Sequence, residues 1–113
     1  MALSPKRLIG ATLTTSAAVY YTATEPVTTR IDTLSVCNYS ASPATFSLYI
    51  VPKSGSPDTS NIVVKDRSIA AGGAGRVLEA FGQWVPPGGT IQMVASAGSA
   101  ITVTASGIEQ TSI

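Results

Sequence analysis

The feature that most constrains the fold of this chain is a two-residue alternation of apolar and more polar side chains. Phe46, Leu48 and Ile50 alternate with more polar residues, and the pattern returns in residues 90–96 and 100–106. Successive side chains of a strand point to opposite faces of a sheet, so each segment would bury one face and expose the other. No window of about 11 residues shows the 3.6-residue period of an amphipathic helix. The alternation therefore predicts an all-β protein.

Turn-forming residues divide the chain into short segments of this kind. Breaks that contain Gly or Pro recur roughly every 10–20 residues, which is the spacing of strands in a sandwich or barrel. The predicted strands are residues 7–14, 17–23, 28–38, 44–52, 61–70, 75–82, 90–96 and 100–109. A count of about eight antiparallel strands favours a jelly-roll-like β-sandwich, although an immunoglobulin-like sandwich has similar segments.

The 113 residues are expected to form a single domain, residues 1–113, without a linker or an internal repeat. Residues 1–7 are expected to form an N-terminal arm that reaches onto an adjacent subunit. Within the third predicted strand, Ile31 and Leu34 differ in parity, which predicts a β-bulge near Asp32.

The charge of the chain is low and dispersed. Charged residues make up 12% of the sequence, the formal net charge is +1, and Ser and Thr together form about a quarter of the residues. Lys6 and Arg7 are the only adjacent basic pair, so the clustered basic surface of a nucleic-acid-binding protein is missing. No apolar stretch approaches the roughly 18 residues of a membrane span or follows Lys6 and Arg7 as in a signal peptide. We expect a protein made in the cytoplasm, with no nucleic-acid or membrane partner.

The inventory of reactive side chains predicts that the protein is not an enzyme. Histidine is absent and there is one cysteine, which removes the usual catalytic triads, a zinc site and an internal disulfide. Cys37 ends an apolar stretch and is expected to be buried. The glycine-rich residues 72–75 lack the Lys-Ser/Thr pair of a phosphate-binding loop. We therefore expect no catalytic residues, no cofactor and no metal.

Three aromatic residues are candidate interface residues: Tyr39, Tyr49 and Trp84. Trp84 precedes a Val-Pro-Pro-Gly-Gly turn. A tryptophan in such a place can anchor a protein–protein contact or offer its ring to a sugar. The interface interpretation is favoured, and carbohydrate remains the alternative ligand.

Four segments, taken in their order along the chain, resemble small all-β virion proteins of tailed bacteriophages. They are GATLTTSAAVYYT at residues 10–22, LSVCN at 34–38, LYIVP at 48–52 and VPPGGTIQ at 85–92. The resemblance extends over residues 8–109 and depends on the order of the segments. It implies a β-sandwich without catalytic residues, encoded among head and tail structural genes.

The resemblance implies a virion structural protein that self-associates and binds the capsid or the neck and tail assembly. A head-decoration role is favoured, with a homo-oligomer, preferably a trimer, and other virion proteins as partners. The protein would be made in the cytoplasm of the host bacterium and end in the virion. The alternative is a receptor- or carbohydrate-binding module of a phage fibre or tail.

Overall fold

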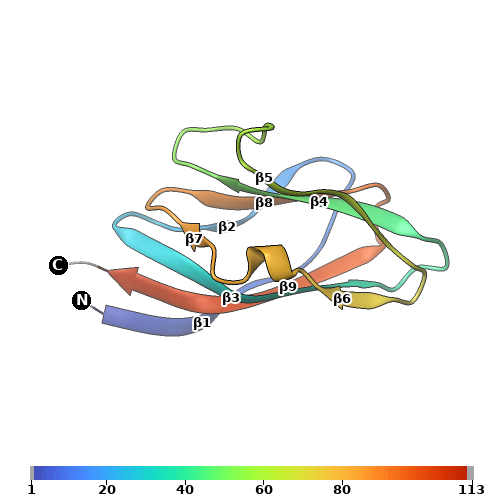
Figure 1. Cartoon of the computed structure of the whole chain (residues 1–113), viewed down its shortest axis with the longest axis horizontal. Helices are drawn as coiled ribbons and strands as arrows, with labels where there is room; N and C mark the ends of the chain where they lie inside the picture. Colours follow the sequence, from blue (N-terminus) through green and yellow to red (C-terminus); the bar gives the residue numbers. More distant parts are fainter. Residues whose placement is uncertain (1, 112–113) are drawn as a thin grey trace.

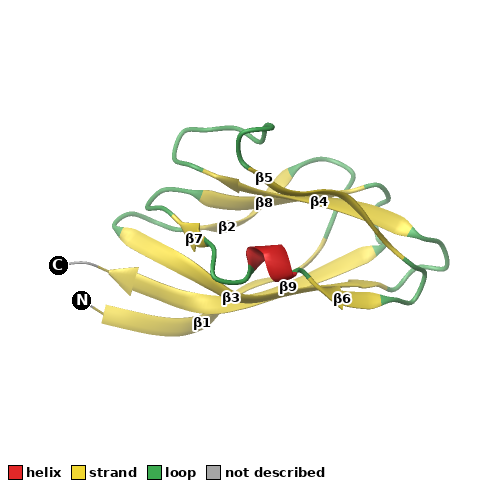
Figure 2. Cartoon of the chain, viewed as in Figure 1, coloured by secondary structure: helices red, strands yellow, loops and turns green. Residues whose placement is uncertain are grey.

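The computed structural model describes residues 2–111 and consists of two antiparallel sheets packed face to face (Figures 1 and 2). In chain order the elements are β1 (Ala2–Thr12), β2 (Ala18–Thr22), β3 (Val27–Asn38), β4 (Ala44–Val51), β5 (Ile62–Ile69), β6 (Ala74–Arg76), the 3-10 helix η1 (Leu78–Ala80), β7 (Trp84–Val85), β8 (Thr90–Ala95) and β9 (Ile101–Thr111). The prediction of an all-β sandwich is confirmed.

The strand order is that of a jelly roll. The larger sheet has the order β1-β9-β3-β6, with β7 also paired to β3, and the smaller sheet has the order β2-β8-β4-β5. β6 and β7 together occupy the place of one edge strand, so the nine strands of the described residues correspond to the eight positions of the fold. Two long strands, β3 and β9, form the centre of the larger sheet.

One predicted strand is wrong in part. Residues 75–82 were expected to be continuous, but β6 ends at Arg76 and η1 follows before β7 begins. The register of β3 against β9 shifts between Ile31 and Thr33, which confirms the predicted bulge. A bulge locally disrupts the ladder. Beside this bulge, the segment after β6 leaves the strand conformation, forms η1, and returns to β7 through Gly82, whose φ is +81°.

The structure places residues 2–7, expected as an N-terminal arm, in the first half of β1. They pair with residues 106–111 of β9. Main-chain pairing does not require apolar side chains, and the side chains of residues 3–7 are exposed. This is why an amphipathic pattern could not reveal this part of the strand.

The core lies between the sheets and is built from the inward-facing side chains of both. Phe46, Leu34 and Met93 are among its largest members, each no more than 1% exposed. Cys37, expected in the core, is exposed instead. Its neighbours Val36 and Asn38 are buried, but the alternation of β3 turns Cys37 to the outer face of the larger sheet.

A buried hydrogen-bond cluster joins the two sheets near the chain ends. The Tyr21 hydroxyl, on β2, donates to the Glu109 carboxylate and pairs with the Thr29 hydroxyl, both in the larger sheet. Lys6 Nζ lies 3.4 Å from Glu109 Oε2. Burial raises the pKa of Tyr21 to about 12, and the hydrogen bond to the Glu109 carboxylate acts in the same direction.

We expect Tyr21→Phe to lower the free energy of unfolding by about 1–3 kcal/mol, because it leaves buried Thr29 without its partner. The folded-state pKa lies above the ordinary value of 10.0. The Tyr21 hydroxyl therefore makes its full contribution to the free energy of unfolding below pH 10, and this contribution declines as the pH rises towards 12. Urea unfolding of both proteins at neutral and strongly alkaline pH measures the difference.

The control is Tyr39→Phe, since Tyr39 is exposed and its change is expected within about 0.5 kcal/mol. An equal cost of Tyr21→Phe at neutral and alkaline pH would contradict the role of the Tyr21 proton.

Candidate interaction surfaces

An apolar row crosses the outer face of the larger sheet near the two chain ends. The register aligns Pro5 of β1 with Ile108 of β9, Ile108 with Arg30 of β3, and Arg30 with Trp84 of β7. Both neighbours of Arg30 along β3 are fully buried, so the row points outward. Leu3, two residues before Pro5, is 59% exposed on the same face. We call these five residues the outer patch.

Arg30 and Trp84 form the polar and aromatic part of the outer patch. The Arg30 guanidinium lies 5.9 Å from the centroid of the Trp84 ring, within range of a cation–π interaction. Arg30 Nε also donates to Asp32 Oδ1 at 2.8 Å. Trp84 remains 47% exposed. Tryptophan and arginine are the residue types enriched at the energetic centres of protein interfaces.

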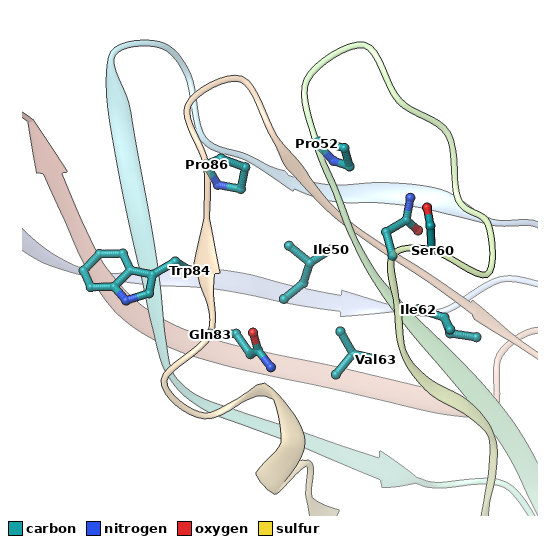
Figure 3. A pocket seen from close by; sticks show the side chains of 9 residues that line it. Ile50, Pro52, Ser60, Ile62, Val63, Gln83, Trp84 and Pro86 are labelled. Atoms are coloured by element: carbon teal, nitrogen blue, oxygen red, sulfur yellow. The ribbon is translucent and has the colours of Figure 1, made fainter.

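An open groove of about 380 Å³ lies between β4, β5 and the segment around β7. Figure 3 shows Ile50 and Val63 facing Gln83 across it, whereas the Trp84 ring is turned away from these residues. The lining residues are all uncharged: Ile50, Pro52, Ser60, Asn61, Ile62, Val63, Gln83, Trp84 and Pro86. The groove thus combines an apolar wall with a few amide and hydroxyl groups, a composition suited to binding.

The loops at the end of the molecule away from the chain ends contain no charged residue. Because all the strands run antiparallel, the loops 13–17, 39–43, 70–73 and 96–100 gather at one end, the right side of Figure 1. None of them contains Asp, Glu, Lys or Arg. Tyr39, 54% exposed, is the one large exposed side chain among these four loops. We call this end the uncharged pole.

The three candidate interface residues predicted from the sequence lie on different parts of the structure. Trp84 lies in the outer patch and at the rim of the groove, and Tyr39 lies on the uncharged pole. Tyr49 is half-buried on β4 in the smaller sheet, paired with Gln92 of β8.

Sequence reasoning missed the contribution of Leu3, Pro5, Arg30 and Ile108 to the outer patch. No local signal marks them, because only the register of β1, β9 and β3 brings them together. The expected N-terminal arm also left Leu3 and Pro5 outside the sheet.

Within residues 2–111, the structure holds no group of three or more His, Cys, Asp or Glu side chains that could bind a metal ion. The described part of the chain also has no helix of the length and apolarity needed to cross a membrane.

By its strand order the protein is a jelly-roll β-sandwich, and comparisons with known proteins agree with this fold class. One similar solved structure comes from work on Bacillus endospore appendages, described as a novel family of disulfide-linked pili. The TM-score is 0.50 at 15% sequence identity, and the match covers 96% of this chain and 88% of the other. At this identity the match shows the fold alone. No protein-family model and no curated protein matches the sequence.

Proposed function

We propose that the protein is a structural subunit that associates with copies of itself and has no catalytic activity. The observation that supports this most is the outer patch, where Leu3, Pro5, Ile108, Arg30 and Trp84 form one exposed surface. Stable contacts of this kind bury on the order of 1,200–2,000 Å² in total. The low charge of the chain lets copies approach without strong repulsion.

The setting we propose is the virion of a tailed bacteriophage, with a head-decoration role favoured. The sequence resemblance supports this setting, and the likeness to a pilus protein supports an assembled polymer or particle more generally. The protein would be synthesised in the host cytoplasm and bind other virion proteins. A trimer would favour decoration or a fibre, and a ring of six or twelve would favour the neck or tail.

Cysteine chemistry distinguishes this chain from a disulfide-linked assembly. The similar solved structure comes from disulfide-linked pili, whereas this sequence has Cys37 alone. One cysteine forms one disulfide at a time, so it can join two copies but cannot link each copy to two neighbours. An extended assembly of this chain would therefore depend on non-covalent contacts.

The reactive groups in the chain support the proposal that the protein has no catalytic activity. The sequence has no histidine, the usual general base at neutral pH. The buried Tyr21 hydroxyl contacts the half-buried Glu109 carboxylate, but it donates a hydrogen bond to that carboxylate and its pKa is raised to about 12. The Tyr21 hydroxyl is therefore not poised to release its proton near pH 7.

The test is the native mass of the protein and of a double variant, Trp84→Ser with Ile108→Ser, by light scattering on a sizing column. We expect the unchanged protein to be oligomeric and the variant to dissociate, because truncating a central anchor costs about 2 kcal/mol or more, roughly 30-fold in affinity. Leu78→Ser is the control, since Leu78 is 65% exposed but lies outside the outer patch. A strictly monomeric unchanged protein would contradict the proposal.

Exposure of Trp84 beside Gln83 also favours a second candidate, binding of a carbohydrate. Trp84 is the only tryptophan in the sequence, so the fluorescence of the protein reports on this residue. Arg30 already lies over the ring, and we expect no saturable fluorescence change with host polysaccharide. A saturable change would favour the carbohydrate-binding module instead.

A further inference from the structure

The uncharged pole and the groove have matching properties at opposite ends of the molecule. The chain extends 48 Å along its longest axis, and the antiparallel strands carry the loops of the pole to one end and residues 52, 60, 61 and 86 of the groove towards the other. The seven basic and six acidic residues all lie outside the four loops and outside the groove lining. Neither surface has a charged residue of its own, and the nearest recorded charge at the groove is the exposed Asp58 carboxylate, which accepts hydrogen bonds from Ser60 at its rim.

The pole carries an exposed aromatic side chain and the groove is hollow. On the pole, Tyr39 shares its loop with small residues such as Ala41, and its N–H donates a hydrogen bond to the Ala100 carbonyl at 2.9 Å, which holds it beside the loop of residues 96–100. The groove offers an open apolar space formed by Ile50 and Val63. One surface thus offers an exposed aromatic ring and the other a largely apolar hollow.

The groove also has an acceptor for the tyrosine hydroxyl. Gln83 Nε2 donates to the Glu79 carbonyl at 3.2 Å, which orients the amide and leaves its Oε1 as an acceptor. Figure 3 shows the Gln83 side chain directed towards Val63, within the groove. Tyrosine is suited to such a place, because its ring is apolar and its hydroxyl requires a partner when buried.

We infer that a second copy of this chain occupies the groove, with Tyr39 of one copy inserted between Ile50, Val63 and Gln83 of the next. This inference rests on the proposed self-association and specifies its geometry. The two surfaces differ and lie at opposite ends, so the contact is head-to-tail and repeats into a ring or an open chain. The outer patch shares only Trp84 with the rim of the groove, and its other four residues remain free to form a lateral contact.

Directed cross-linking tests this geometry. Two proteins, both with Cys37→Ser, receive one new cysteine each: Ala41→Cys beside Tyr39 on the pole, and Ser60→Cys at the groove. Both sites are exposed, so the fold should tolerate them, and matching urea unfolding midpoints verify this. After mild oxidation of the mixture, we expect disulfide-linked dimers that join position 41 to position 60, with few dimers from either protein alone.

Adding Tyr39→Asp to the Ala41→Cys protein should reduce the cross-linked yield at least tenfold, because a carboxylate would enter an uncharged groove. Adding Leu78→Ser instead should leave the yield unchanged. If the unchanged protein is oligomeric but positions 41 and 60 do not cross-link, or 41-to-41 dimers dominate, the head-to-tail inference is overturned while self-association stands. If the protein is monomeric and no cross-link forms, both fail.

Discussion

Replacing Phe46 with alanine is expected to lower the free energy of unfolding by about 3–5 kcal/mol. Phe46 is 1% exposed and lies on β4, an interior strand that pairs with β8 on one side and β5 on the other. Neighbours held by two ladders cannot collapse into the space that the ring leaves, so the cost includes a cavity as well as lost burial. Urea unfolding followed by circular dichroism measures it.

The chain offers a matched control for this change. Phe81, the second of two phenylalanines, is only partly buried and follows η1 outside the regular strands. We expect Phe81→Ala to cost at most half as much as Phe46→Ala, and Phe46→Leu to cost under about 1.5 kcal/mol. Equal costs at positions 46 and 81 would show that the space between the sheets is not the main source of stability.

Gly107→Ala is expected to destabilise the fold by about 3 kcal/mol, at the upper end of the cost of overpacking. A Cβ atom built at Gly107 would lie 2.0 Å from the carbonyl oxygen of Arg30. Gly107 of β9 pairs with Ile31 of β3 at the centre of the larger sheet, so relief requires two backbones to separate. The same displacement moves Arg30 of the outer patch, and we expect weaker self-association as well.

The control for this prediction is Gly98→Ala. A Cβ atom at Gly98 meets nothing within 4 Å, and we expect a change within about 0.5 kcal/mol. Thermal unfolding of the two variants beside the unchanged protein gives the comparison. Similar unfolding temperatures for the two variants would mean that β3 and β9 can separate at Gly107 without loss, contrary to the packing described above.

Strand positions and the sandwich were predictable because they depend on local periodicity. The alternation of Phe46, Leu48 and Ile50 fixes which face of β4 is buried, and the parity change after Ile31 identified the bulge in β3. The same rule assigns Cys37 to the outer face once Val36 and Asn38 are known to be buried. The expectation for Cys37 was wrong because it relied on residue type rather than on parity.

The candidate surfaces were predictable only in part. Tyr39 and Trp84 are large aromatic residues near turns, and their type and place were enough to select them. The break between β6 and β7 was not foreseen, because it arises where the bulge of a distant strand interrupts the ladder. Tyr49 was selected by the same reasoning as Trp84, yet it is half-buried among the strands of the smaller sheet.

By itself, then, the sequence determined the all-β class, the approximate strand bounds, the bulge and the low, dispersed charge, because these depend on residues a few positions apart. The tertiary structure alone decided that Pro5, Ile108, Arg30 and Trp84 form one row and that Tyr39 and the groove lie at opposite poles. These arrangements join residues far apart along the chain. They depend on which strands pair and in which register, and a shift of one residue would turn every side chain to the other face.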